Sequence, residues 1–210
     1  DTPITNFRKD DLDVISQRIR LFPRLALSKL KGEEKAPKRA GVVVPVGFDL
    51  EGHPSILFTL RSNHVGTHKG EVGFPGGRLE PDDPSIEDCA VRELEEEIGL
   101  PRSRVQVIGK LSDALSITGI VVTPVVGFLG TLQVAEMTPS SHEIDQIFVV
   151  RLSELTDPKN ISWSNLRRGN IPVFQVHNFP PIWGLTAYIL QNFFKNILKI
   201  ELPSPPPESK

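Results

Sequence analysis

Three stretches of the chain repeat apolar residues every three or four positions, the spacing of an amphipathic helix that lies on a core. They are residues 9–30, 85–98 and 182–199. In the first of them, Leu12, Ile15, Ile19 and Phe22 form the apolar face. We therefore expect three principal helices.

Short apolar runs bounded by turn residues predict β-strands between these helices. Residues 41–47 and 56–60 form a first pair, joined by a tight turn at residues 49–53. Further apolar runs cover residues 105–108, 119–129, 144–150 and 171–176. Strands and helices in this order predict an α/β (α+β) fold, in which a mixed β-sheet is sandwiched between helices.

A length of 210 residues suits one domain with one substantial core. We expect residues 1–40 to form a helix and a basic linker packed on this domain, and residues 41–200 to form the domain itself. Residues 201–210 are rich in proline, which neither continues a helix nor pairs inside a sheet, so we expect a disordered tail.

The charge balance narrows the class of partner. Lys and Arg number 24 against 26 Asp and Glu, a net charge of −2 that gives no general attraction to nucleic acid or anionic lipid. We expect a small-molecule partner, with no nucleic acid and no membrane, and a monomer or homodimer. The single cysteine, Cys89, is expected to be a small core residue of a protein from a reducing compartment.

The helix predicted at residues 85–98 has recognisable ends. Asp83 is suited to capping the free amides, Pro84 is favoured in the first turn, and Gly99 is suited to the left-handed conformation after the last turn. The helix is therefore about four turns long.

Three carboxylates share one face of this helix. At about 100° per residue, Glu93, Glu96 and Glu97 fall within roughly a third of the circumference. They repel one another, and a bound cation offsets this repulsion most simply. Carboxylate oxygens suit Mg²⁺ or Mn²⁺. The alternative is an exposed acidic helix end stabilised by Arg92.

The loop upstream favours the metal site. It reads Gly70-Glu71-Val72-Gly73-Phe74-Pro75-Gly76-Gly77-Arg78. Its glycines permit close approach of the backbone to a ligand, and its carbonyl groups are able to join a metal shell.

The nine residues Arg92-Glu93-Leu94-Glu95-Glu96-Glu97-Ile98-Gly99-Leu100 resemble the second half of the Nudix box, and every fixed position of that pattern is present. The resemblance implies the Nudix fold and diphosphate hydrolysis. It also implies that Glu93, Glu96 and Glu97 are metal ligands, that Arg92 orients them, and that the Gly77 carbonyl is a further candidate ligand.

The first half of the box departs from the general pattern. Arg78 stands where the pattern has glycine, with Gly77 one residue too early, and Pro84 stands where it has glutamate. This spacing resembles the coenzyme A diphosphatase branch of the Nudix enzymes.

The upstream signature of that branch also matches. Its residues here are Leu57-Phe58-Thr59-Leu60-Arg61-Ser62, then Gly70, then Phe74-Pro75-Gly76-Gly77. One position fails, because the second arginine of the signature corresponds to Gly66.

The resemblance implies a set of substrate-binding residues. They are Arg61, Ser62, Lys69, Gly70, Phe74 and Arg78. The positively charged side chains among them, Arg61, Lys69 and Arg78, suit the diphosphate and the 3′-phosphate of coenzyme A. For Arg61 the alternative is a structural ion pair at the end of a strand.

The expected activity is metal-dependent cleavage of the diphosphate of coenzyme A, or of an acyl derivative, to 3′,5′-ADP and a 4′-phosphopantetheine. Glu93, Glu97 and Glu143 are the candidate catalytic residues, with the general base left open between Glu143 and Glu93. The alternatives are a broader hydrolase of ADP-ribose or dinucleoside polyphosphates, and a Nudix binding module without turnover.

Two expectations remain. The resemblance to vertebrate mitochondrial members of the branch favours a mitochondrial location, with peroxisomal and cytoplasmic locations as alternatives. Trp183, at the start of the last predicted helix, is expected to be a core residue rather than a stacking platform for adenine.

Overall fold

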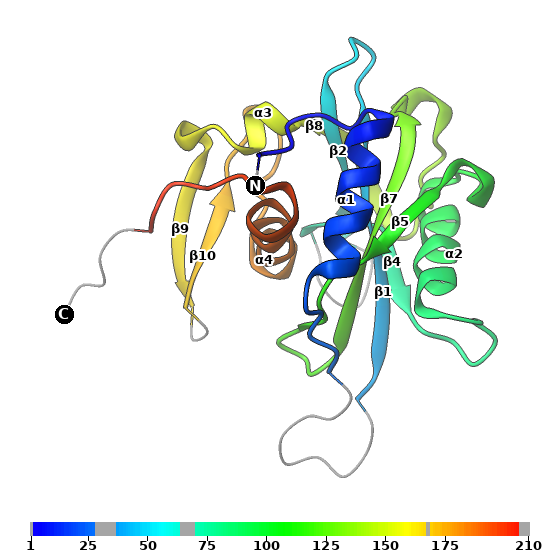
Figure 1. Ribbon diagram of the computed structural model, residues 1–210. Helices are drawn as coiled ribbons and strands as arrows, with labels where there is room; N and C mark the ends of the chain where they lie inside the picture. The colour runs from blue at the N-terminus through cyan, green and yellow to red at the C-terminus, as the bar shows by residue number, and fades with distance from the viewer. Residues whose placement is uncertain (1, 28–36, 64–69, 167–168, 206–210) are drawn as a thin grey trace.

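The computed structural model describes residues 2–27, 37–63, 70–166 and 169–205, and an eight-stranded mixed sheet dominates it (Figure 1). The strands of this sheet are β1 (Arg39–Phe48), β2 (Pro54–Arg61), β3 (Val72–Gly73), β4 (Gly76–Arg78), β5 (Gln106–Lys110), β6 (Ala114–Leu115), β7 (Val121–Thr131) and β8 (Ile144–Arg151). The main order is β3-β2-β1-β7-β5, with β4 beside β1, β6 beside β7 and β8 beside β2. Strands β1 and β7 are parallel, and the other pairs of this sheet are antiparallel.

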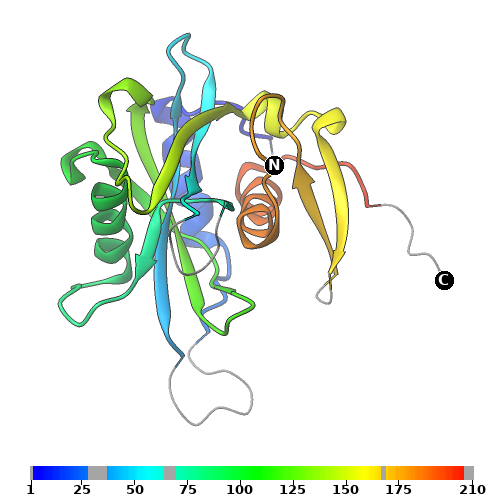
Figure 2. The same ribbon diagram turned by 180° about the vertical axis from the view of Figure 1, so that it is seen from behind.

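Helices cover both faces of this sheet, as Figures 1 and 2 show. The helices are α1 (Lys9–Leu21), α2 (Ile86–Ile98), α3 (Leu152–Leu155), α4 (Gly184–Asn192) and a π-helical continuation of α4 (Phe193–Leu198). Short 3₁₀ turns cover Arg102–Arg104, Val134–Glu136 and Pro158–Asn160. Helix α2 packs on one face, whereas α1 and α4 pack on the other. The predicted mixed sheet between helices is therefore confirmed.

A separate hairpin lies on the far side of α4 from the large sheet (Figure 1). It consists of β9 (Ile161–Leu166) and β10 (Gly169–Phe174), which pair antiparallel. The apolar run at 171–176 predicted the second strand only. The polar sequence of β9 gave no such signal.

The large sheet forks between β1 and β2, and this fork positions the glycine-rich loop at residues 70–78. The two strands pair only near their turn, from Val46 to Phe48. Beyond that point β3 pairs with β2 and β4 pairs with β1. The amide of Val43 donates to Pro75 at 2.9 Å. Pro45, which has no amide hydrogen, occupies the branch point, where one fewer donor needs a partner.

The predicted helix boundaries needed three corrections. Helix α1 ends at Leu21 and not near residue 30, because Pro23 holds Phe22 in an extended conformation. The last helix begins at Gly184 and becomes π-helical at Phe193. The apolar spacing of the sequence does not distinguish these two helix types.

The third correction concerns the start of α2. Ser85, rather than Asp83, caps this helix by accepting a hydrogen bond from the amide of Asp88. Pro84 therefore precedes the helix instead of lying in its first turn. At the other end Gly99 has a φ of 70°, so the predicted left-handed terminus is confirmed.

Four phenylalanine rings form a continuous stack through the core. Phe74 lies 5.4 Å from Phe58, Phe58 lies 5.8 Å from Phe148, and Phe148 lies 4.7 Å from Phe179, measured between ring centroids. Stacked rings add to the free energy of burying each side chain. The stack fixes the loop before β4 relative to the segment that leads into α4.

Most of the predicted basic linker and the end of the predicted tail, residues 28–36 and 206–210, lie outside the described residues. Arg39, which we assigned to the linker, instead begins β1. In the part of the chain that is described, no helix is both long enough and apolar enough to cross a membrane.

A buried carboxylate joins the segment after α1 to the sheet. Asp113, whose side chain is fully buried, accepts hydrogen bonds from Arg24 at 2.7 Å, from Arg39 at 3.0 Å and from Thr123 at 2.7 Å. It also accepts one from the amide of Leu27. Burial alone raises the pKa of Asp113, but these hydrogen bonds outweigh burial and hold the pKa below its usual value.

We predict that Asp113→Asn lowers the free energy of unfolding at pH 7 by about 3 kcal/mol, because two guanidinium groups lose their buried partner. A carboxyl group with a lowered pKa stabilises the fold above its unfolded pKa and loses this effect as pH falls. The difference between variant and wild type should therefore shrink below about pH 4. Urea unfolding at pH 7 and pH 3 measures both effects.

The matched control is Asp13→Asn, on the exposed side of α1, which should leave the midpoint unchanged. Equal stabilities of Asp113→Asn and wild type at pH 7 would contradict the proposed role of Asp113.

Candidate active site

The three glutamates of α2 differ in burial. The side chain of Glu97 is 3% exposed, that of Glu93 is 15% exposed and that of Glu96 is 58% exposed. Glu95 points away from them and pairs with Arg102 at 2.9 Å. The expected acidic face therefore exists, and it is half-buried at Glu93 and buried at Glu97.

Two glycines of β4 allow the helix to approach the sheet this closely. A Cβ atom on Gly77 would overlap the carboxylate of Glu93, and one on Gly76 would overlap the backbone of β1. The amide of Gly76 donates to Glu97 Oε2 at 3.1 Å. A side chain at Gly76 would push β4 away from β1, and one at Gly77 would displace the Glu93 carboxylate, so both glycines are needed for this arrangement.

Arg92 organises the acidic face. Its guanidinium pairs with Asp83 at 2.9 Å, with Glu93 at 3.0 Å and with Glu96 at 3.2 Å. It also donates to the carbonyl of Arg78. Arg92 therefore pairs with two of the three glutamates that it was expected to orient, Glu93 and Glu96, whereas Glu97 pairs with Arg61.

Asp83 contributes to this arrangement in a way that the sequence did not indicate. It accepts two hydrogen bonds from Arg92, through Nε and Nη2, both 2.9 Å long. Such bidentate pairs have defined geometry, and these bonds hold the pKa of Asp83 well below its usual range. In the sequence we interpreted Asp83 as a cap, and also as one of three positions, with Glu80 and Asp82, to which the missing acidic residue of the box could be displaced.

Arg61 connects the end of β2 to the buried glutamate. Its Nη1 atom lies 3.3 Å from Glu97 Oε1. Arg61 therefore forms the ion pair that we had considered as an alternative, but its partner is the most buried carboxylate of the site. The Arg61 side chain remains 28% exposed, so the pair is not fully closed off from solvent.

Glu143 lies at the start of β8, close to the glutamates of α2. Its carbonyl accepts a hydrogen bond of 2.8 Å from the amide of Ser62, which is buried. Its side chain is exposed, and its charge contributes to the pKa values of Glu93 and Glu97. Residues almost 50 positions apart in the sequence therefore share one electrostatic environment.

Burial raises the pKa of Glu97 to about 7, against the opposing effects of Arg61 and the Gly76 amide. Burial likewise raises the pKa of Glu93, and the opposing effect of Arg92 offsets this rise only in part. The neighbouring carboxylates add to the increase in both cases. The protein thus concentrates negative charge where water solvates it poorly, which favours a cation at this place.

Cys89 lies under this site. Its side chain is buried, its Sγ atom lies 3.7 Å from the carbonyl oxygen of Gly77, and burial raises its pKa to about 11. The expected core role of Cys89 is therefore confirmed, and the thiol occupies one side of the Gly77 carbonyl.

The remaining expected substrate residues are dispersed around the loop. Gly70 is exposed with a φ of 65°, and Arg78 is exposed. Phe74 is only 7% exposed, because its ring belongs to the phenylalanine stack. Lys69, like Gly66, lies outside the described residues.

A second group of possible metal ligands lies in the turn between β1 and β2. It consists of Asp49, Glu51 and His53. Arg151 pairs with Asp49 at 2.6 Å and with Glu51 at 3.2 Å, and His53 Nδ1 lies 3.2 Å from Asp49. Arg151 already pairs with both carboxylates, which explains the cluster without a metal ion.

Comparison with known proteins agrees with this site. The NUDIX domain profile matches residues 37–168. The mitochondrial coenzyme A diphosphatase NUDT8 of Mus musculus is 36% identical over 161 residues, which cover 74% of this chain and 76% of that protein. The Homo sapiens protein of the same name is 36% identical and 67% covered. The Nudix hydrolase NudL of Yersinia enterocolitica is 33% identical and 80% covered.

Solved structures show the same fold at lower sequence identity. A NUDIX hydrolase from Nitrosomonas europaea matches with a TM-score of 0.51 and 15% identity, over 81% of this chain and 77% of that chain. A MutT/nudix family protein from Enterococcus faecalis matches with a TM-score of 0.50 and 14% identity, over 88% and 72%. The chain belongs to the Nudix family of hydrolases, which act on diphosphate bonds.

Proposed function

We propose that this Nudix hydrolase cleaves the diphosphate of coenzyme A, or of an acyl derivative, with the help of a divalent metal ion. The observation that carries the proposal is the buried Glu97 carboxylate, held by the Gly76 amide and Arg61 beside Glu93. The substrate class is supported by relatives named coenzyme A diphosphatases and by the sequence from Leu57 to Gly77.

The donor set of the site fits Mg²⁺ or Mn²⁺. Glu93, Glu96 and Glu97 would supply carboxylate oxygens, which hard divalent cations prefer. The Gly77 carbonyl would supply a further oxygen, because its contact with the Cys89 thiol is long and weak. When bound, the metal neutralises charge on the diphosphate and lowers the pKa of an attacking water.

The residues around the metal site would then have separate roles in catalysis. Arg92, fixed by Asp83, holds Glu93 and Glu96 in place. Arg61 is partly exposed to solvent and would bind a phosphate oxygen of the substrate. Glu143 would accept the proton of the water that attacks phosphorus, because Glu93 and Glu97 already pair with arginines. Glu93 is the alternative general base.

The remaining positioning roles are proposed for Ser62, Gly70, Arg78 and Lys69. The products would be 3′,5′-ADP and a 4′-phosphopantetheine, because the water oxygen bonds to one phosphorus while the bond from that phosphorus to the bridging oxygen breaks, and the bridging oxygen leaves with the other phosphate. A mitochondrial location is proposed on the printed names of the mammalian relatives.

Glu97→Gln tests the buried carboxylate in the metal-free protein. Wild-type stability should fall as pH rises from 4.5 to about 7, because the folded carboxyl group holds its proton more tightly than the unfolded chain does. The variant avoids this loss and should be more stable than wild type above pH 7, by on the order of 3 kcal/mol. Thermal unfolding at pH 5 and pH 8 measures the difference.

The same variant tests the metal site. Mg²⁺ should raise the Tm of wild type but not of Glu97→Gln, and turnover should fall by at least about 100-fold. Glu95→Gln is the matched control, since Glu95 pairs with Arg102 away from the site. A normal rate or a normal Mg²⁺ response in Glu97→Gln would remove Glu97 from the metal shell.

Glu143→Gln separates proton transfer from metal binding. We expect kcat to fall by about 100-fold or more, because general bases contribute factors of this size. The Mg²⁺-induced increase in Tm should persist, since Glu143 is not proposed as a ligand. If Glu143→Gln keeps its kcat, Glu93 becomes the preferred base.

A substrate panel tests the branch of the family. With Mg²⁺ present, kcat/KM for coenzyme A or acetyl-coenzyme A should exceed that for ADP-ribose and diadenosine polyphosphates by at least about tenfold, the discrimination available from a few specific contacts. Chromatography of the products measures each rate. Faster cleavage of ADP-ribose would favour the broader hydrolase, and no turnover of any of them would favour a binding module.

A further inference from the structure

An exposed tryptophan lies beside a hollow that the active-site residues do not line. Trp183, which we expected in the core, is 46% exposed. It borders a hollow of about 350 Å³ between the β9–β10 hairpin and the start of α4. Other residues that line this hollow are Ser162, Ser164, Ile171, Val173 and Gln175. We call it the Trp183 groove.

The chemistry of the Trp183 groove suits a flat heteroaromatic ring. The indole of Trp183 offers a face for stacking, which is favourable for every nucleobase. Ile171 and Val173 provide an apolar wall. The hydroxyl groups of Ser162 and Ser164 and the amide of Gln175 are able to donate to or accept from ring nitrogens. Pantetheine has no ring, so stacking selects the adenine half of coenzyme A.

Two contacts hold the Trp183 groove in a fixed relation to the active site. Thr186, one turn after Trp183 in α4, donates to the carbonyl of Val72 in β3 at 3.1 Å. From β3 the chain runs through Phe74 to Gly76, whose amide binds Glu97. Figure 2 shows this loop reaching from the large sheet toward α4.

The phenylalanine stack gives the second connection. Its first ring, Phe74, belongs to the active-site loop, and its last ring, Phe179, lies four residues before Trp183. Packed rings of this kind move little relative to one another, so the stack helps to fix the groove in position relative to the glutamates.

We infer that the Trp183 groove binds the adenine base of the substrate, with Trp183 stacking on its ring. This inference rests on the proposed function, because it assigns the adenosine half of coenzyme A to a defined place. Trp183 is a specificity residue in this assignment. It takes no part in the proton transfer or in metal binding.

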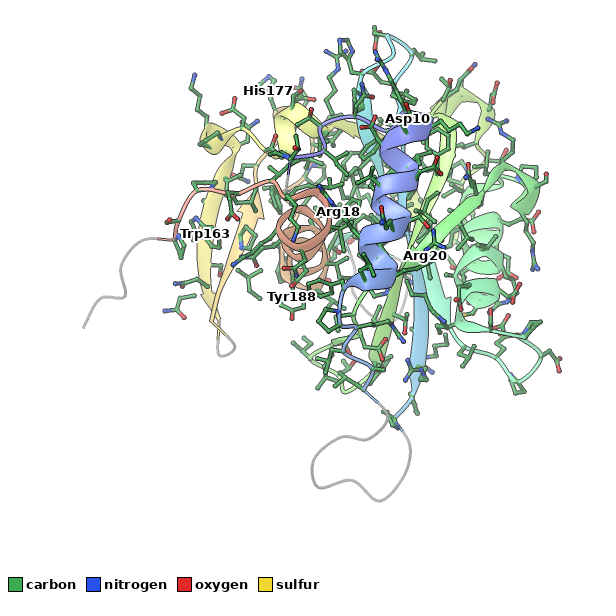
Figure 3. The ribbon with its side chains drawn as sticks, viewed as in Figure 1. Asp10, Arg18, Arg20, Trp163, His177 and Tyr188 are labelled. Carbon is green, nitrogen blue, oxygen red and sulfur yellow. The ribbon has the colours of Figure 1, made fainter. Side chains whose placement is uncertain are left out.

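The chain offers a matched control, because it contains two tryptophans. Trp163 lies on β9 between Ser162 and Ser164, and unlike them it does not line the groove. Figure 3 labels Trp163 on this strand.

The kinetic test compares Trp183→Leu with Trp163→Leu. For coenzyme A, Trp183→Leu should raise KM about tenfold and leave kcat within about twofold, which is the effect of losing one stacking contact. Trp183→Phe keeps a ring and should restore most of the affinity, whereas Trp163→Leu should leave KM unchanged. An unchanged KM in Trp183→Leu would overturn the assignment.

A binding test does not depend on turnover or on the stability of Trp183→Leu. In Trp163→Leu the only remaining indole is that of Trp183, and 3′,5′-ADP should quench its fluorescence in a saturable manner. 4′-Phosphopantetheine should not quench it. Absence of quenching by 3′,5′-ADP, or stronger quenching by 4′-phosphopantetheine, would overturn the inference. Failure of the protein to hydrolyse any coenzyme A species would instead overturn the proposed function, whatever the fluorescence shows.

Discussion

The contact between the glutamate face of α2 and the glycine pair of β4 is the constraint on which the rest of the site depends. Gly77 leaves room for the Glu93 carboxylate, and the amide of Gly76 reaches Glu97. This contact exists because the sheet forks between β1 and β2 and admits the loop between them. A sheet without this fork would pair β1 with β2 along their length and leave no place for β4 and its two glycines beside β1.

The same contact explains the charges around it. Carboxylates brought this close and partly out of water destabilise one another, and three arginine interactions compensate only in part. Arg92 is held by Asp83 and shared between Glu93 and Glu96, whereas Glu97 pairs with Arg61 and accepts a hydrogen bond from the Gly76 amide. Burial raises the pKa of Glu97 despite these contacts, and the neighbouring carboxylates add to the increase. A fold that tolerates such an imbalance is suited to binding a cation, and the stability it gives up is recovered on binding.

Much of this arrangement could be predicted from local sequence, and the rest depends on distant residues. The acidic face of α2 and its end at Gly99 follow from helical geometry, and both are present. The role of Asp83 was predicted wrongly, because an aspartate before a helix suits a cap and an arginine partner equally well. The Arg61–Glu97 pair and the buried Asp113 cluster join residues that no sequence spacing relates. Trp183 was misassigned because periodicity gives the face of a residue within a helix, and Trp183 precedes the first turn.

Cys89 gives the site a further property. The proposed substrate carries a thiol, and its oxidised forms are disulfides that react with any accessible thiolate. The single cysteine of the chain is buried beneath the loop, and its pKa of about 11 keeps it protonated at neutral pH. A neutral, enclosed sulfur neither attacks a disulfide nor becomes trapped as a mixed disulfide. A protein that acts on the proposed substrate would thereby keep its own thiol chemically inert toward it.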